Sequence, residues 1–117
     1  MKEGYNLSPQ EIMDKVSKGK PYTLLLLKTG EALPEDETLQ KELQMGHLAH
    51  LFNMEKEGLI SVFGPINEGG ELEGIIVFNT TDLEEIKSLM STDPYIKDGY
   101  LKYELFQFFS IPGQKLL

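Results

Sequence analysis

Two short apolar segments restrict the fold of this chain more than any other feature of its sequence. Residues 22–28 read Tyr-Thr-Leu-Leu-Leu-Leu-Lys, and residues 74–78 read Gly-Ile-Ile-Val-Phe. Turn signals bound both segments and both are short, so each is expected to be a strand buried on two faces. Because 117 residues make one ordinary domain, few other elements remain to cover the resulting sheet.

The other expected elements alternate with these two strands. A long helix is predicted over residues 34–58, with Pro34 in its first turn, where a missing N–H costs nothing. Residues 59–63 are the expected second strand, Asp82 caps a second helix, and residues 100–109 form the last strand. The order is β-α-β-β-α-β, which predicts an α+β fold of the ferredoxin-like, or split βαβ, type.

An N-terminal extension is expected before this domain. Residues 1–21 are assigned to the extension and residues 22–117 to the domain. Ser8, Pro9 and Glu11 have the spacing of a capping box with proline at the first helical position, so the extension is predicted to contain a short helix.

The second face of the sheet is predicted to need a cover from outside the chain. The two main helices of a ferredoxin-like domain normally cover one face only. The first and third strands are apolar on both sides, so the opposite face would expose apolar side chains. A second copy of the chain is the simplest cover, which predicts a homodimer.

Charge and composition exclude several classes of function. The net charge is −8, which disfavours nucleic acids and anionic membrane surfaces as partners. The chain has no cysteine, so disulfides, thiolate metal sites and cysteine nucleophiles are excluded. No segment has the apolar length of a signal peptide or a transmembrane helix, and a cytoplasmic location is therefore expected.

Two histidines and one aspartate are the main candidates for chemistry. His47 lies on the apolar stripe of the long helix, so its ring is expected to point toward the sheet. His47 is then either a core histidine with one satisfied hydrogen bond or an acid–base group tuned by its neighbours. Asp93 precedes Pro94, so it is either a helix cap or a carboxylate that faces His47 and fixes its tautomer.

The remaining candidates are weaker. His50 is expected to be structural or incidental, because a pair at i, i+3 supplies only two metal ligands and nothing nearby completes a site. Gly64 and Pro65 either form a turn or let the backbone approach a ligand closely. Lys28, at the end of the first strand, is a candidate contact for an anionic substrate. Nucleotide-binding, dinucleotide-binding, nucleophile-elbow and zinc-protease motifs are absent from the sequence, so no metal or cofactor is predicted.

An ordered set of short motifs resembles the YCII-related (YciI-like) family. The set consists of His47-Leu48-Ala49-His50-Leu51, Phe63-Gly64-Pro65, Gly74-Ile75-Ile76-Val77-Phe78 and Asp93-Pro94-Tyr95. The resemblance runs from about residue 22 to residue 110. It implies a dimeric α+β barrel of ferredoxin-like subunits and a His–Asp pair in a pocket, which maps to His47 and Asp93. One relative resembles a dehydrochlorinase of a chlorinated hydroxyhydroquinone, but the family does not fix a substrate.

Three hypotheses about function follow. The first is a cofactor-independent enzyme that uses the His47–Asp93 pair for elimination or isomerisation of a small molecule, with aromatic and phenolic compounds as candidates. In this hypothesis Gly64, Pro65 and Lys28 contact the substrate. The second is a binder of small molecules without turnover, and the third is a purely structural dimer. The sequence does not name the substrate or the reaction.

Overall fold

Four strands form one antiparallel sheet in the computed structural model, which describes residues 6–117. The spatial order is β2 (Ile60–Pro65), β3 (Leu72–Phe78), β1 (Lys20–Thr29) and β4 (Leu101–Ser110). The central strand β1 pairs with β3 on one side and with β4 on the other, and every neighbouring pair is antiparallel. This order is that of the split βαβ pattern, so the predicted ferredoxin-like α+β fold is confirmed.

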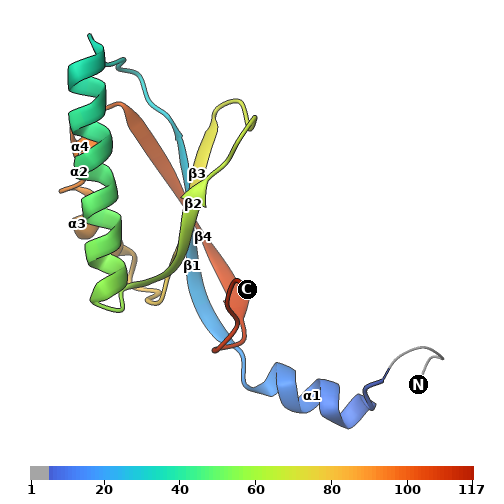
Figure 1. The fold of residues 1–117 in the computed structure, drawn as a ribbon. Coiled ribbons are helices and arrows are strands. Elements are labelled where there is room, and N and C mark those ends of the chain that lie inside the picture. Colours follow the sequence, from blue (N-terminus) through green and yellow to red (C-terminus); the bar gives the residue numbers. More distant parts are fainter. Residues whose placement is uncertain (1–5) are drawn as a thin grey trace.

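Three helices cover one face of this sheet. Figure 1 shows α2 (Glu37–Lys56), α3 (Leu83–Met90) and α4 (Pro94–Lys97) gathered on the same side of the strands. An aspartate caps each of them, because its carboxylate accepts backbone N–H groups that have no partner within the helix. Asp36 caps α2, Asp82 caps α3 and Asp93 caps α4.

Two predicted boundaries were wrong. The long helix begins at Glu37 rather than at Pro34, because Asp36 is the N-cap and accepts the N–H of Leu39 at 2.8 Å. Gly64-Pro65 belongs to β2 rather than to a turn after it, with Gly64 opposite Ile75. Proline is tolerated there because β2 is an edge strand.

The core lies between the three helices and the sheet. Its sheet side is formed by the inward residues of β1, β2 and β3, and its helix side by α2 and α3. The buried members are Leu25, Leu27, Leu51, Met54, Ile60, Ile76, Phe78, Ile86 and Met90. Because strand side chains alternate between faces, Leu25 is fully buried while its neighbours Leu24 and Leu26 on the opposite face are partly exposed.

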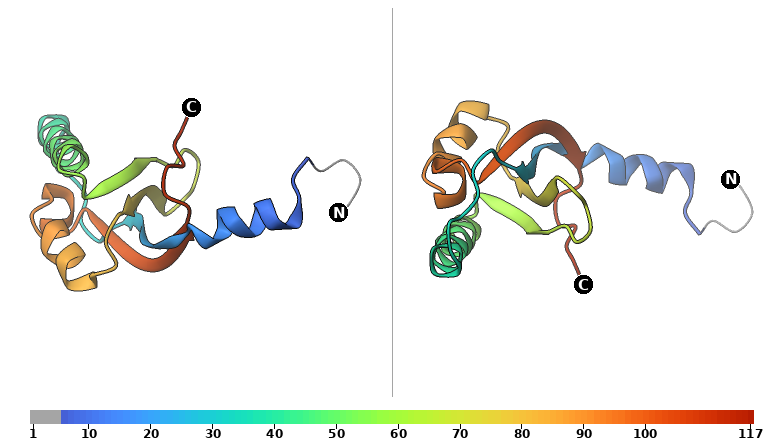
Figure 2. Two further views of the ribbon diagram at one scale, coloured as in Figure 1. Left: turned by 90° about the horizontal axis from the view of Figure 1, so that it is seen from below. Right: turned by 90° about the horizontal axis from the view of Figure 1, so that it is seen from above.

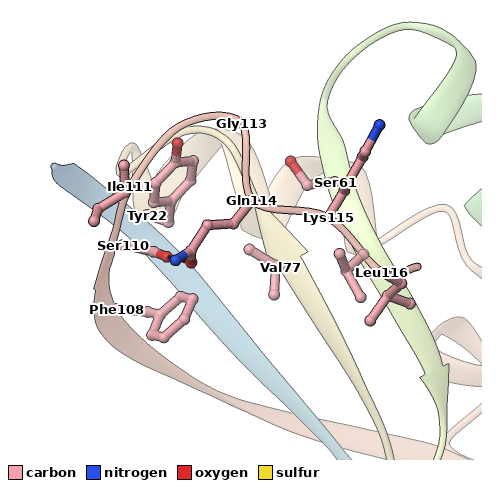
Figure 3. Close-up of a pocket in the computed structure, with 11 residues that line it drawn as sticks. Tyr22, Ser61, Val77, Phe108, Ser110, Ile111, Gly113, Gln114, Lys115 and Leu116 are labelled. Carbon is pink, nitrogen blue, oxygen red and sulfur yellow. Dashed lines mark hydrogen bonds between the residues drawn. The ribbon is translucent and has the colours of Figure 1, made fainter. Parts of the chain in front are cut away.

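The opposite face of the sheet, here called the open face, has no helix over it within residues 6–117. It carries Leu24, Val77, Phe106 and Phe108, of which the two phenylalanines are 45% and 37% exposed. The C-terminal tail from Ile111 crosses one end of this face, and Figure 3 shows it above the strands. A cavity of about 500 Å³ lies between tail and sheet, and its lining within residues 6–117 includes no histidine, aspartate or glutamate.

The helix α1 (Pro9–Ser17) extends away from the rest of the molecule, as both views in Figure 2 show. Its predicted capping box is present, since Ser8 and Glu11 bond each other's backbone N–H groups. None of its residues is buried. Across residues 6–117, no helix is long and apolar enough to cross a membrane, and the cytoplasmic location stays a prediction.

Candidate active site

A buried carboxylate joins both histidines of the chain. Asp93 is fully buried, and its Oδ2 atom lies 2.6 Å from Nδ1 of His47 and 3.1 Å from Nδ1 of His50. Its other oxygen, Oδ1, accepts the backbone N–H of Tyr95 at 2.9 Å. In this geometry Asp93 caps α4 and contacts both histidines at once.

Helix geometry brings these groups into contact. His47 and His50 are three residues apart on α2, so their side chains point to neighbouring positions on one side of the helix. The helix α4 can approach that side because Gly46 has no side chain: a Cβ atom there would lie 2.8 Å from Cγ of Pro94. Gly46 therefore lets Pro94, and Asp93 beside it, sit directly against α2.

The surroundings of Asp93 favour its charged form. Burial alone would raise its pKa, but the hydrogen bonds from His47 and His50, the charge of His47 and the backbone N–H of Tyr95 outweigh burial. The net effect holds the pKa of Asp93 well below its ordinary value of 3.8. An ionised carboxylate only accepts hydrogen bonds, so we infer that Nδ1 of His47 carries a hydrogen and donates a hydrogen bond to Asp93.

A cavity of about 380 Å³ opens on the other side of His47. It lies between α2, the adjoining ends of β1, β2 and β3, and the loop before α2. Its apolar wall includes Leu51, Phe63 and Leu101, and its polar side chains are Thr29, Gln40, Gln44, Glu73, Tyr95 and Tyr100. The side chain of His47 is 12% exposed. Among the described residues no hydrogen bond occupies its Nε2 atom, so this nitrogen is free for a ligand.

Tyr95 is the aromatic neighbour of His47. The two rings meet edge to face, with centroids 5.0 Å apart. Burial, followed by the charges of Asp93 and Glu73, raises the pKa of Tyr95 above its ordinary value of 10.0. Its hydroxyl therefore stays protonated at neutral pH and can donate a hydrogen bond to a bound molecule.

The structure separates the sequence-predicted contact residues into two groups. Gly64 and Pro65 line the same cavity as His47. Lys28 does not: it belongs to the open face and forms an ion pair with Glu104. The predicted role of Lys28 in binding a substrate therefore has no support at this cavity.

Sequence reasoning missed two contributors to the site and left the part played by a third open. His50 was expected to be structural or incidental, and in the structure it bonds Asp93, while its Nε2 lies 3.3 Å from Oγ1 of Thr92. Tyr95 had a signal, because it directly follows the Asp93-Pro94 cap. Glu73 had none, because no residue near it in the sequence indicates the register shift between β1 and β3.

Comparison with known proteins places the chain in a family. The sequence model of the YCII-related domain matches residues 21–109. This chain belongs to the YCII-related domain family. The match begins after α1 and ends one residue before the end of β4, so the family domain includes the sheet, the three covering helices and the cavity. No curated protein matches the chain significantly.

One similar solved structure is 5-chloro-2-hydroxyhydroquinone dehydrochlorinase from Burkholderia phenoliruptrix, in complex with 2,5-dihydroxybenzoquinone. The TM-score is 0.53 at 17% identity, over 74% of this chain and 92% of that one. At this identity the likeness supports the YCII-type fold alone.

Within residues 6–117, no three His, Cys, Asp or Glu side chains are grouped so that they could hold a metal ion.

Proposed function

We propose that this YCII-related protein is a cofactor-independent enzyme that moves a proton on a small molecule bound beside His47. One observation carries the proposal: His47 bonds a buried aspartate through Nδ1 while its ring lines a cavity of about 380 Å³. Such a volume lies within the usual range for ligand pockets. A histidine oriented by a carboxylate is a common arrangement for general acid–base catalysis.

In this proposal His47 is the general base and then the general acid. Nε2 takes a proton from the substrate, and the electron pair left behind forms a new double bond. In an elimination, the leaving group departs with its own bonding pair. In an isomerisation, the imidazolium returns the proton to a different atom. Asp93 holds the ring in place and stabilises the imidazolium, because its ionised carboxylate faces Nδ1.

The solved structure with a similar fold guides the choice of compounds to test. The dehydrochlorinase with a similar fold acts, by its name, on a hydroxylated ring and removes a chloride with a proton. We extend from it only the kind of substrate, a small hydroxylated ring. Halogenated and non-halogenated phenols and quinols are therefore the first compounds to screen.

The test is turnover by His47 variants once a substrate is found. We expect His47→Gln to lose about 10²–10⁴-fold in kcat, the usual contribution of a positioned acid–base group. Met45→Gln is the matched control on the same helix, because Met45 is exposed and does not line the cavity. Full activity of His47→Gln together with the control would refute the catalytic role.

A second candidate function is ligand binding without turnover, which the cavity also favours. Its distinguishing result is a compound that raises the melting temperature and is recovered chemically unchanged. In that case His47→Gln changes affinity but no reaction is lost.

We also propose that the open face packs against a second copy of the chain in a homodimer. The exposed Phe106 and Phe108 and the partly exposed Leu24 and Val77 support this proposal, because a monomer rarely leaves such a patch uncovered. Light scattering should then give twice the chain mass of 13.3 kDa. A particle of 13.3 kDa at micromolar concentration would contradict it.

A further inference from the structure

The wall of the cavity opposite the histidine carries a carboxylate that the proton-transfer chemistry does not use. Glu73 lines the cavity from β3. One of its oxygens accepts a hydrogen bond from Oγ1 of Thr29 at 2.8 Å. No bond within residues 6–117 occupies the other oxygen, Oε2, so it is available to a ligand.

A β-bulge directs this carboxylate into the cavity. Leu27 of β1 pairs with Gly74 of β3, but the next residue, Lys28, pairs with Leu72. Glu73 is therefore an extra residue in β3 without a partner in β1. A bulge bends its strand and re-aims a side chain, and here it turns Glu73 toward Thr29 on the helix-covered side.

The charged side chain in the cavity wall is negative. Among the described residues that line the cavity, none is a lysine or an arginine, and Glu73 is the only acid. Asp93 adds a second negative charge behind His47. The charges of both acids reach Tyr95, which helps to keep its hydroxyl protonated. An anionic ligand would meet like charges here and no positively charged lysine or arginine, whereas a hydroxyl group could donate to Glu73.

We infer that Glu73 is a specificity-determining residue, which selects uncharged, hydroxyl-bearing ring compounds and rejects carboxylates and phosphates. The inference rests on the proposed function only for the location of the site. Leu51, Phe63 and Leu101 supply the apolar surface for the ring, and Glu73 accepts a hydrogen bond from its hydroxyl. The sequence had suggested an anionic substrate bound by Lys28, whereas the cavity lining favours an uncharged one.

Two probes of nearly equal size test the inference. Resorcinol is an uncharged ring with two hydroxyls, and in 3-hydroxybenzoate a carboxylate, ionised at neutral pH, replaces one of them. Titrations followed by the NMR signals of the side-chain amides of Gln40 and Gln44, which line the cavity, give an affinity for each probe. We expect 3-hydroxybenzoate to bind at least about fivefold more weakly, the factor that one like charge at contact distance imposes even in bulk water.

The variant Glu73→Gln should reduce this discrimination. Its amide oxygen can still accept the hydrogen bond from Thr29, and the residue is exposed, so the fold is retained. Glu71→Gln is the matched control, because it removes the same charge two residues away without lining the cavity. The ratio of the two affinities should fall toward one in Glu73→Gln and stay at its wild-type value in Glu71→Gln.

Four results would overturn the inference. The first two are equal affinities for the two probes in the wild-type protein and an affinity ratio that Glu73→Gln leaves unchanged. The others are a ratio that Glu71→Gln changes equally and no saturable shift with millimolar resorcinol. The outcome is independent of catalysis. If the ratio responds to Glu73→Gln but His47→Gln never alters a reaction, the binding inference stands and the enzymatic proposal fails.

Discussion

The two faces of the sheet carry similarly apolar residues but have different surroundings. On the helix-covered face, Leu25, Ile76 and Phe78 are completely buried. On the open face, Leu24 and Val77 are partly exposed and Phe106 is 45% exposed. The candidate site lies on the covered side, where α2 and the ends of the strands enclose a cavity. The apolar pattern of the strands thus predicts that both faces must be buried. The helices that bury one face also carry the candidate catalytic residues.

The largest expected difference between the faces is in stability. Phe78→Ala should lower the free energy of unfolding by about 3–5 kcal/mol, because it leaves a cavity in the packed core. Phe106→Ala, on the open face, should cost less than about 1 kcal/mol in dilute protein. Urea unfolding measures both. Equal costs at low concentration would mean that the open face is already covered within one chain.

The next effect tests the buried carboxylate. Asp93→Asn should cost about 1.5–3 kcal/mol at pH 7, the usual contribution of hydrogen bonds to a charged group. Asp82→Asn is the control, because Asp82 caps an exposed helix start and asparagine caps equally well. If Asp93→Asn lowers the free energy of unfolding no more than Asp82→Asn does, Asp93 acts only as a helix cap.

The same pair of variants gives a pH test with a definite sign. Since folding depresses the pKa of Asp93, its stabilising contribution is fully present above the ordinary value of 3.8 and is lost as pH falls through the folded pKa. The difference in unfolding free energy between wild type and Asp93→Asn should therefore shrink only below about pH 4. A difference that already shrinks above pH 5 would contradict the depressed pKa.

A smaller effect is expected from Gly46→Ala. In an exposed helix this change stabilises by about 1 kcal/mol, but here the new Cβ would collide with Pro94. We expect the two effects to cancel or to leave a net loss, and the contact between Asp93 and His47 to lengthen in a crystal structure. Met45→Gly, at an exposed neighbouring position, measures how much a glycine destabilises this helix where no neighbour is in contact. A full stabilisation of about 1 kcal/mol would show that α4 moves away freely.

The smallest effect is expected from removal of α1. None of its residues is buried, so deletion of the chain up to Ser17 should change the free energy of unfolding by less than about 0.5 kcal/mol. Thermal melts of both lengths measure this change. A larger loss would mean that the extension and the domain are not separate units.

Local patterns predicted the fold well because each element carries its own signal. The leucine stripe of α2, the aspartate caps of α3 and α4 and the apolar runs of β1 and β3 are all visible within a few residues. The errors fell where local signals compete, as at Pro34, where the side chain of Asp36 provides the cap two residues later.

The site was less predictable because it depends on contacts between distant elements. Asp93 and His47 are 46 residues apart, so local signals left their pairing as one of two alternatives, and the resemblance to a family favoured it. The second bond, from His50, requires the close approach of α4 that Gly46 permits. The position of Glu73 depends on a bulge, which appears only when the register of two paired strands is known.

The most direct test of the His47–Asp93 pair is an NMR measurement of the histidine ring nitrogens. Long-range proton–nitrogen correlations report which nitrogen carries the proton in the neutral ring, and comparison with His50→Gln assigns the signals. Our account predicts that neutral His47 is protonated at Nδ1, toward Asp93, and has a free Nε2 facing the cavity. A neutral His47 protonated mainly at Nε2 would contradict it, since that nitrogen could not then accept a proton from a substrate.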